Sequence, residues 1–284
     1  MAGRLALEAL QQLVERLVGW MPQYAFDPCA VEIGFGLEGE PGPGWQLDLA
    51  AGHRLVLRGR IDRVDLCASS SGEHTLAVVI DYKSRPRKLD ATKLYHGLEL
   101  QLLAYLNAVV YSGGWPELHH ARLEPAGAFY VGLQAERVSA SSRAEAHEPG
   151  AAAPASRYQH AGRFLADALE QFDNRQAAVG DQFRYCKNQG GEFSQRGTDA
   201  LAKPDFDALL ARNEALLRRH AEAIFRGEVS VTPFRTSRET ACERCEYRAI
   251  CRFDPWTQPH RFLAPPPKPP AAAASGRPPK RKKP

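Results

Sequence analysis

The stretch GRIDRVDLCASSSGEHTLAVVIDYKS, Gly59–Ser84, holds two β-strand patterns joined by a turn. Apolar and polar residues alternate over Val56–Val64, which predicts a strand with one buried face. The run ASSSGEHT, Ala68–Thr75, is rich in turn-forming residues and predicts a hairpin. The run TLAVVI that follows is apolar throughout, which is typical of a strand buried on both faces at the centre of a sheet.

Charged residues stand where these two strands end. Asp81 and Lys83 follow the apolar run and share one face, because side chains at i and i+2 of a strand point to the same side. Asp62 lies on the hairpin partner. Carboxylates bind Mg²⁺ or Mn²⁺, and we expect the backbone carbonyl of Tyr82 to be a further ligand. Lys83 could then orient an attacking water or stabilise charge on a phosphate, so the pattern suits metal-assisted phosphodiester cleavage.

The Asp-x-Lys pattern by itself also occurs in many proteins as an exposed ion pair at a strand end. The order of the surrounding elements argues for the functional interpretation: Gly-x-x-Asp on one strand, a hairpin, Asp-x-Lys on the next, then a helix that carries Gln101 and Tyr105 on one face. Asp65 is out of phase with Asp62 and should face the other side of the strand, so we expect it to have a structural role.

Strands and helices alternate along the rest of the chain, which predicts the α/β class with a central mixed sheet flanked by helices. The N-terminal 25 residues contain an amphipathic helix, and a β-rich run follows at Phe26–Gly36. Further patterns predict a helix through Leu98–Val109, a strand at Ala126–Leu133, a loop leading into a helix over 157–174, and a long helix from Lys203 that ends at Gly227.

Charge is unevenly distributed in the 284 residues, whose formal net charge is +4. Six of the 37 Lys and Arg residues and none of the 33 acids fall in the last twenty positions. This Pro-rich end is either a disordered solubilising tail or a nonspecific phosphate-binding arm, whose basic residues would include Lys280, Arg281, Lys282 and Lys283. The body is slightly acidic, so any DNA affinity there requires a local groove.

No apolar run approaches the about 20 residues that a membrane helix needs, and the N-terminus lacks the uninterrupted apolar core of a signal peptide. We therefore expect a cytoplasmic protein without a membrane partner. Six cysteines in such a chain are not expected to form a disulfide framework. Cys242, Cys245 and Cys251 have the spacing Cys-x2-Cys-x5-Cys, which indicates metal ligands and leaves zinc and an iron–sulfur cluster equally open.

Gly59–Asp62, Asp81–Lys83 and the Gln-x-x-x-Tyr of Gln101 and Tyr105 together resemble the RecB-like branch of the PD-(D/E)XK nuclease superfamily. The resemblance implies a restriction-endonuclease-like core, metal binding by Asp62 and Asp81, and a catalytic role for Lys83. It also implies that Gln101 and Tyr105 support the lysine and contact DNA. Glu32 matches a glutamate often found on the preceding strand of these nucleases; it could support the metal site or close an ion pair, and both remain open.

A nuclease core followed by the cysteine cluster resembles the AddB/RexB subunits of bacterial helicase–nucleases and the CRISPR-associated RecB-like nucleases. This implies a [4Fe–4S] cluster whose fourth cysteine lies upstream of the core. Here the fourth ligand would have to come from Cys29, Cys67, Cys186 or another molecule. The sequence has no Gly-x-x-x-x-Gly-Lys motif, so we do not expect an ATPase. The chain looks like the C-terminal nuclease portion of such a subunit, or like a fragment that has lost its upstream part, which could impair activity.

The resulting domain prediction is an N-terminal helix at 1–25, a nuclease core at 26–135, a mobile loop at 136–157, a helical, cysteine-containing C-terminal part at 158–263 and a disordered tail at 264–284. The leading functional hypothesis is a Mg²⁺-dependent DNA exonuclease acting on single- or double-stranded DNA in break repair and recombination, with an AddA-like helicase–nuclease partner. The alternatives are an inactive DNA-binding or scaffolding remnant and a zinc-binding structural module.

Overall fold

The computed structural model describes residues 2–118, 122–133, 158–175, 177–194 and 197–267. The predicted mobile loop at 136–157 lies outside these ranges, as do residues 268–284 of the tail predicted at 264–284, with its basic residues at 280–283. The chain divides into two compact units. The first contains residues 1–89 and 99–228, and the second contains residues 90–98 and the chain from 229 onward.

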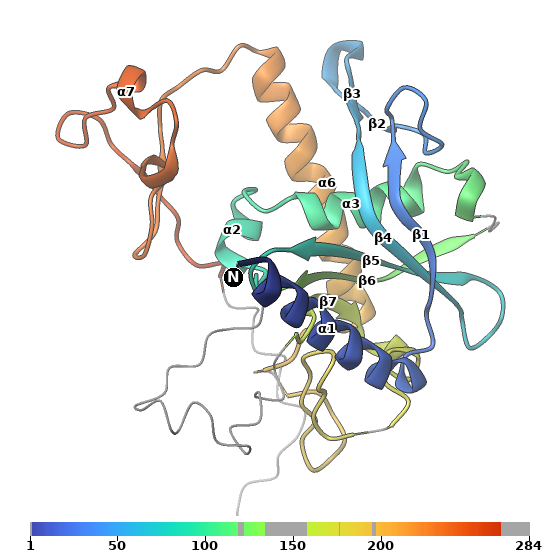
Figure 1. Cartoon of the computed structure of the whole chain (residues 1–284). Helices are drawn as coiled ribbons and strands as arrows, with labels where there is room; N and C mark the ends of the chain where they lie inside the picture. The colour runs from blue at the N-terminus through green and yellow to red at the C-terminus, as the bar shows by residue number, and fades with distance from the viewer. Residues whose placement is uncertain (1, 119–121, 134–157, 176, 195–196, 268–284) are drawn as a thin grey trace, which may run out of the picture. The chain divides into compact units, whose positions relative to one another are not determined.

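The first unit is built on a six-stranded mixed sheet with the strand order β1-β4-β5-β6-β7-β8 (Figure 1). Antiparallel pairs join β1 to β4, β4 to β5 and β6 to β7, whereas β5 pairs with β6 and β7 with β8 in parallel. The predicted mixed central sheet is confirmed. Its strands are β1 (Asp27–Phe35), β4 (Gly59–Ala68), β5 (Thr75–Lys83), β6 (Leu123–Gly132), β7 (Ala161–Leu165) and β8 (Ala200–Leu201).

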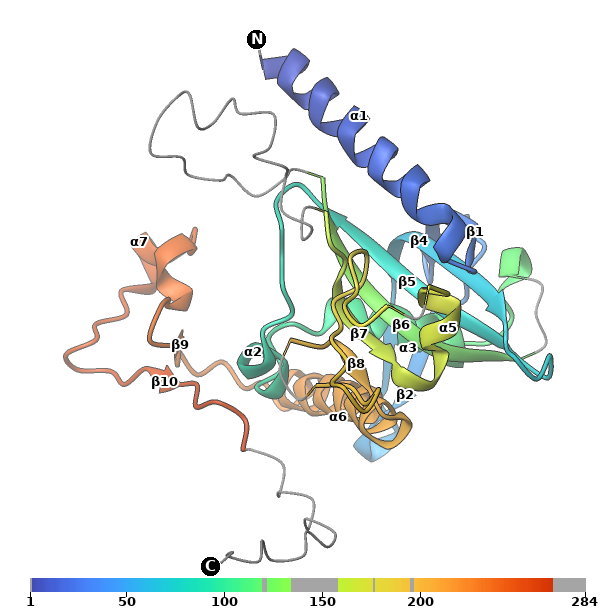
Figure 2. The same cartoon turned by 90° about the horizontal axis from the view of Figure 1, so that it is seen from below.

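Helices cover both faces of this sheet, as Figures 1 and 2 show together. On one face lies α1 (Ala2–Trp20), and on the other lies α3 (Gln101–Tyr111), which packs against β5, β6 and α6 (Lys203–Phe225). The described part of the unit also contains the short α5 (Leu169–Phe172) and four 3-10 helices. These 3-10 helices span Met21–Gln23, Ala50–Gly52, Pro116–Leu118 and Ala166–Ala168.

Strand β5 is the buried centre of the sheet, as its apolar sequence predicts. Every residue from Leu76 to Asp81 is at most 5% exposed. Such a strand can be apolar throughout because helices cover both of its faces. This packing on both faces fixes the position of Asp81 and Lys83 at the end of β5.

An aromatic cluster fills the space between the sheet and α1. Phe129 of β6 lies 4.8 Å from Phe183 and 5.7 Å from Phe172, measured between ring centroids. Trp20, at the end of α1, contacts the ring of His160 at 5.8 Å. Aromatic pairs at these distances bury large apolar areas and fix ring orientation, so this face is a rigid layer behind the sheet.

Two predicted elements differ from the structure. Residues 161–165, expected to be loop before a helix, form β7, and β8 also lies within the part expected to be helical. The antiparallel pairing of β7 with β6 buries Phe164 and Leu165, and only a short helix, α5, follows. The strand expected at Val56–Val64 is interrupted at Arg58: β3 (Arg54–Leu57) pairs with β2 (Trp45–Asp48) in a separate hairpin, and β4 begins at Gly59.

The second unit has little regular structure. Its elements are α2 (Ala91–Tyr95), α7 (Arg248–Cys251), a 3-10 helix at Ala241–Arg244, and a parallel pair formed by β9 (Phe234–Arg235) and β10 (Arg261–Phe262). Asp90 caps α2 by accepting hydrogen bonds from the amides of Thr92 and Lys93. The 90–98 segment is fastened to the later part of the unit, because Lys93 pairs with Glu239 at 2.5 Å and His96 Nε2 lies 2.9 Å from the carbonyl oxygen of Ala264.

Within the described part of the chain, the helices are all too short or too polar to cross a lipid bilayer.

Candidate active site

Asp81 and Lys83 form an ion pair at the end of β5. The distance from Asp81 Oδ2 to Lys83 Nζ is 2.5 Å. The acid is almost completely buried, with 3% of its side chain exposed, whereas 25% of the Lys83 side chain is exposed. The pair therefore presents its cation to solvent and keeps its carboxylate inside the sheet.

Asp62 approaches the same strand from β4. Because Arg63 pairs with Ile80 in the antiparallel ladder, Asp62 stands opposite Asp81. The backbone amide of Tyr82 donates a hydrogen bond of 2.7 Å to Asp62 Oδ2. The structure thus brings the two predicted acids and the predicted lysine together at one end of the β4–β5 hairpin.

The charges at this hairpin end oppose one another. Burial raises the pKa of Asp81, the hydrogen bond and positive charge of Lys83 lower it, and the negative charge of Asp62 raises it again. Two neighbouring carboxylates repel each other, and a bound cation relieves that repulsion. Mg²⁺ binds carboxylate oxygens of this kind and usually keeps several of its waters. The donor set therefore fits a divalent cation held by Asp62, Asp81 and the predicted Tyr82 carbonyl.

Among the described residues, no three His, Cys, Asp or Glu side chains are grouped closely enough to hold a metal ion. The two acids of the hairpin end would thus need backbone carbonyl, water or phosphate oxygens to complete a coordination shell. Mg²⁺ sites commonly have this composition, with one or two carboxylates and the remaining ligands from water or substrate phosphates.

Gln101 and Tyr105 occupy successive turns at the start of α3. Gln101 Nε2 donates a hydrogen bond of 2.8 Å to the Tyr105 hydroxyl, as expected for residues at i and i+4 of a helix. The Tyr105 ring packs edge-on against Phe35 of β1 at 5.9 Å. This contact packs the start of α3 against β1, the strand that also carries Glu32.

Gly59, the glycine of the Gly-x-x-Asp motif, provides the room for this packing. A Cβ at position 59 would lie 3.1 Å from an edge carbon of Phe35 and 3.2 Å from an edge carbon of Tyr105. These distances are tighter than ordinary van der Waals contact. The motif therefore has two parts: the glycine admits Tyr105, and the aspartate reaches β5.

Glu32 is exposed and stands opposite Asp62 in the β1–β4 ladder, since its neighbours Val31 and Ile33 pair with Arg63 and Ile61. Its φ of 50° is unusual for a residue other than glycine. Its carbonyl oxygen accepts a hydrogen bond from Arg60 at 3.3 Å. Metal support and ion pairing both remain predictions for its carboxylate.

Asp65 lies on the opposite face of the sheet from Asp81, because it pairs with Val78, three residues before Asp81. It is 0% exposed and accepts hydrogen bonds from Arg63 at 2.6 and 2.7 Å and from the Tyr24 hydroxyl at 2.9 Å. Burial raises its pKa, and the hydrogen bonds and charge of Arg63 oppose that shift. These contacts are those of a residue that holds the fold together.

Three residues near the acid site were missed in the sequence. Tyr130 is buried and pairs in parallel register with Asp81, and burial raises its pKa to about 12. Arg87 lies over the Tyr130 ring and pairs with Glu99 at 3.4 Å. The basic run from Lys83 to Lys88 was the available signal for Arg87; nothing in the local sequence connects it to Tyr130 or Glu99.

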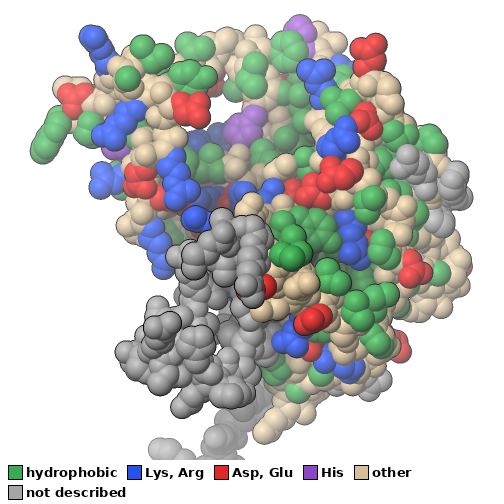
Figure 3. Space-filling model, in the orientation of Figure 1, with side chains coloured by type: hydrophobic (Ala, Val, Ile, Leu, Met, Phe, Trp, Pro, Cys, Tyr) green, Lys and Arg blue, Asp and Glu red, His purple; other side chains and the backbone are tan. Residues whose placement is uncertain are grey.

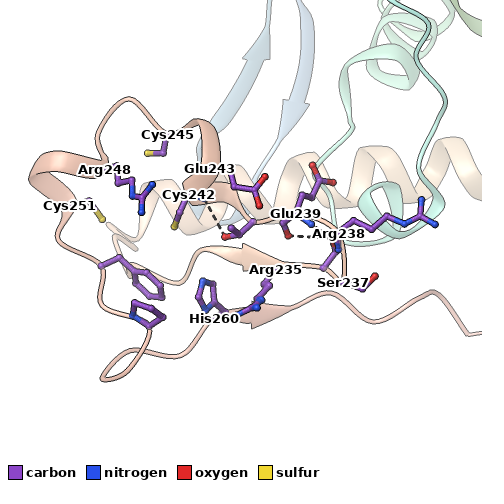
Figure 4. A pocket seen from close by; sticks show the side chains of 14 residues that line it. Arg235, Ser237, Arg238, Glu239, Cys242, Glu243, Cys245, Arg248, Cys251 and His260 are labelled. Atoms are coloured by element: carbon purple, nitrogen blue, oxygen red, sulfur yellow. Dashed lines mark hydrogen bonds between the residues drawn. The ribbon is translucent and has the colours of Figure 1, made fainter. Parts of the chain in front are cut away.

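The cysteine motif lies entirely in the second unit. Cys242, Cys245 and Cys251 line one pocket there, and Figure 4 shows Arg248 among them. The same pocket is also lined by Glu239, Glu243 and His260. Among the described residues the three thiols do not converge on a common point, and Cys29, Cys67 and Cys186 all belong to the first unit. A four-cysteine set for a [4Fe–4S] cluster is therefore not complete within the described second unit.

Surface charge does not form a single-sign field over the face of the first unit seen in Figure 3. Basic, acidic and apolar side chains are intermixed there. Any attraction of this face for a polyanion must arise from a few positioned cations. The basic tail residues Lys280–Lys283 lie outside the described chain.

Comparisons with known proteins agree with this geometry. Residues 2–252 match the family described as the PD-(D/E)XK nuclease superfamily. An ATP-dependent helicase/deoxyribonuclease subunit from Symbiobacterium thermophilum is 35% identical over 261 residues, which are 91% of this chain and 22% of that protein. The subunit of the same name from Moorella thermoacetica is 34% identical over 252 residues, covering 87% of this chain and 21% of its own length. The chain spans about a fifth of the length of these relatives.

Proposed function

Because the chain belongs to the PD-(D/E)XK nuclease superfamily, we propose that it is a Mg²⁺-dependent deoxyribonuclease whose site is formed by Asp62, Asp81 and Lys83. Membership in that family confirms the resemblance found in the sequence. The observation that carries the proposal is the hairpin end, where the amide of Tyr82 binds Asp62 and the carboxylate of Asp81 contacts Lys83 at 2.5 Å.

Each residue has a distinct proposed role. Asp62 and Asp81, with the Tyr82 carbonyl, would hold the cation, which when bound would lower the pKa of an attacking water and polarise the scissile phosphate. Lys83, partly exposed beside Asp81, orients that water or stabilises the charge that develops on the phosphate. Gln101 and Tyr105 support this arrangement from α3 and contact DNA, and Glu32 is an additional candidate ligand.

The test is cleavage of end-labelled single- and double-stranded DNA by the purified chain with Mg²⁺ or Mn²⁺. Asp81→Ala and Lys83→Ala should each lower the rate by at least about a hundredfold, in line with the loss of a residue that stabilises transition-state charge. Asp48→Ala, which removes an exposed acid of β2, is the matched control and should cleave like wild type. Cleavage that survives both site variants would refute the assignment. DNA binding without cleavage under any divalent metal would instead support the inactive-remnant alternative.

The named relatives also suggest a setting. They are subunits of an ATP-dependent helicase/deoxyribonuclease, and this chain corresponds to about a fifth of each. We propose that the chain acts as an exonuclease with an AddA-like helicase–nuclease subunit in double-strand-break repair, in the cytoplasm. Exonuclease action predicts degradation of linear DNA and none of a closed circle of the same sequence. Co-purification with the helicase subunit tests the partnership.

The cysteine motif is a second proposed metal centre. Cys242, Cys245 and Cys251 line one pocket, and we propose that they bind either a [4Fe–4S] cluster or zinc together with a fourth ligand. Anaerobic purification followed by metal analysis and a visible spectrum separates the two: a cluster gives iron, sulfide and a brown colour, whereas zinc gives a colourless protein with one metal per chain. A metal-free protein with full nuclease activity would refute both.

The basic tail is proposed to be a phosphate-binding arm rather than only a solubilising end. Deleting residues 280–284, which include Lys280, Arg281, Lys282 and Lys283, should weaken DNA binding equally for all sequences and make it less sensitive to salt. An unchanged salt dependence would leave the tail with its solubilising role alone.

A further inference from the structure

Arg87 stands beside the acid site without belonging to the nuclease motifs. It follows Lys83 by four positions, in the loop after β5. Its guanidinium carbon lies 4.9 Å from the centroid of the Tyr130 ring, and Lys83 Nζ lies 5.5 Å from the same centroid. Tyr130 pairs with Asp81 in the parallel β5–β6 ladder. Lys83 and Arg87 thus both lie over the buried ring of Tyr130, next to Asp81.

The guanidinium is held in place while remaining accessible. Its Nη2 lies 3.4 Å from Glu99 Oε1, and that acid is buried, with 7% of its side chain exposed. The Arg87 side chain itself is 42% exposed. Since an arginine has five N–H donors in a planar fork, an ion pair at one nitrogen leaves other donors to face solvent. The ring and the buried acid therefore limit the freedom of Arg87 without enclosing it.

The charge of Arg87 already acts on the site. It lowers the pKa of Asp81, although less than the nearer Lys83 does. The five charged groups concerned, namely Asp62, Asp81, Glu99, Lys83 and Arg87, have a net charge of about −1 when all are ionised. A divalent cation would change this to about +1, which complements one DNA phosphodiester. Without Arg87 the loaded site would be neutral.

We propose that Arg87 is a phosphate-binding residue of the nuclease site, which binds a DNA backbone phosphate at or next to the scissile bond alongside Lys83. The inference rests on the proposed deoxyribonuclease function and extends it to a residue outside the Gly-x-x-Asp, Asp-x-Lys and Gln-x-x-x-Tyr motifs. An arginine suits this role because its fork binds two phosphate oxygens at once, whereas a lysine acts as a point charge.

The first experiment measures binding of a fluorescent single-stranded oligonucleotide and a duplex to the full chain in EDTA, over a series of salt concentrations. Arg87→Ala should weaken binding about tenfold at low salt, because it removes one charge-assisted hydrogen bond to a phosphate. The slope of log affinity against log salt should fall by about 0.7 for the single strand and about 0.9 for the duplex. Arg87→Lys should restore the slope, because it keeps the charge.

Arg85→Ala is the matched control, since it removes an equally charged, exposed side chain from the same loop. It should weaken binding less than about threefold. Equal losses from Arg85→Ala and Arg87→Ala would overturn the proposal, because the effect would then belong to the general charge of the loop. Unchanged affinity and slope in Arg87→Ala would overturn it directly.

A second control separates phosphate binding from support of the fold. Glu99→Gln removes the ion pair and leaves Arg87, so it should retain the wild-type salt slope. If Glu99→Gln loses as much affinity as Arg87→Ala, the ion pair and not the guanidinium is responsible, and the proposal is wrong. Calorimetric titration with Mn²⁺ should show that Arg87→Ala binds the metal at least as tightly as wild type, because the variant loses only a cation; a loss of metal binding would likewise contradict phosphate recognition.

Cleavage assays then distinguish the two proposals. At saturating Mg²⁺, Arg87→Ala should lower kcat/KM by at least about tenfold, and Arg87→Lys should recover part of that loss. A wild type that binds DNA but does not cleave it would refute the proposed nuclease function, while the binding series would still decide the role of Arg87.

Discussion

The backbone amide of Tyr82 donates a 2.7 Å hydrogen bond to the side chain of Asp62, so the acid of β4 is fixed to the strand that carries Asp81 and Lys83. The Tyr82 side chain points to the other face, where its hydroxyl accepts a hydrogen bond from Arg63 at 3.2 Å. Tyr82 therefore contacts the acid site through its backbone and the part-buried Arg63, the partner of Asp65, through its side chain.

The two acids of the Gly-x-x-Asp strand should separate activity from stability. Asp62→Ala should abolish cleavage and lower the free energy of unfolding by no more than about 1.5 kcal/mol, because it removes one partly exposed hydrogen bond. Asp65→Ala should cost about 3 kcal/mol, because it leaves the part-buried Arg63 and Tyr24 hydroxyl without their buried acceptor. Urea unfolding and a nuclease assay check both. An Asp65→Ala protein as stable as wild type would contradict the structural assignment.

Asp81 should cost stability when it is ionised without a metal. Its pKa is raised in the folded protein, so the protonated carboxyl favours folding. This stabilisation is fully present below the unfolded pKa and is lost as the pH rises through the folded pKa. Asp81→Asn should therefore raise the melting temperature at pH 7 in EDTA while abolishing cleavage. Mg²⁺ should stabilise wild type and not the variant. A lower melting temperature for Asp81→Asn in EDTA would show that its ion pair with Lys83 outweighs burial.

His160 should make the first unit sensitive to mild acid. Burial lowers its pKa to about 4, with a smaller contribution from the charge of Arg63. Because the folded pKa lies below the unfolded one, stability is present above the unfolded pKa and is lost as the pH falls from about 6.5 to about 4, by about 3 kcal/mol in all. His160→Phe, which retains an aromatic ring beside Trp20 and Phe183, should flatten this pH dependence in urea unfolding. An equally steep loss in the variant would assign the effect to other groups.

Gly59→Ala should damage both packing and activity. The added methyl would press on Phe35 and Tyr105 at 3.1 and 3.2 Å, and overpacking of this kind costs about 1–3 kcal/mol. Displacement of Tyr105 should also slow cleavage. Gly19→Ala is the matched control, since position 19 lies in α1 with no atom within 4 Å, and it should stabilise the protein by about 0.5–1 kcal/mol. Similar melting temperatures for the two variants would refute the packing argument.

Asn213 should support the start of α3. Its Nδ2 donates a hydrogen bond of 3.0 Å to the carbonyl of Leu100, the residue before Gln101, and the buried Asn107 reaches back from α3 to the carbonyl of Leu210 at 3.2 Å. Asn213→Ala should lower the free energy of unfolding by about 1–3 kcal/mol and reduce cleavage. Comparison with Asn107→Ala, which changes the later part of α3, should show the larger loss of cleavage in Asn213→Ala.

Local patterns were sufficient to predict the centre of the fold. The uninterrupted apolar run before Asp81 requires a strand covered on both faces, and the hairpin before it places Asp62 opposite Asp81. The phase difference between Asp62 and Asp65 also placed Asp65 on the other face. In each case the information lies within a few residues and follows from strand geometry.

The missed elements depend on contacts between distant segments. Strand β7 has only five residues, and its strand character comes from pairing with β6 on the other side of a long connection. The position of Arg87 depends on Tyr130 and Glu99, which β6 and the segment before α3 bring to it. Neither relationship has a periodic pattern, because tertiary packing determines both.

The division of the chain has a practical consequence for truncation. Three peptide bonds, after residues 89, 98 and 228, join the two units. Residues 90–98 belong to the second unit and connect two segments of the first unit, which end at Leu89 and begin again at Glu99. Arg87 and Glu99 flank this segment and form an ion pair within the first unit. A protein cut after Glu228 would retain residues 90–98 but lose Glu239 and Ala264, which bind Lys93 and His96. Isolating the first unit therefore requires two edits, removal of the C-terminal segment and replacement of residues 90–98 by a short linker.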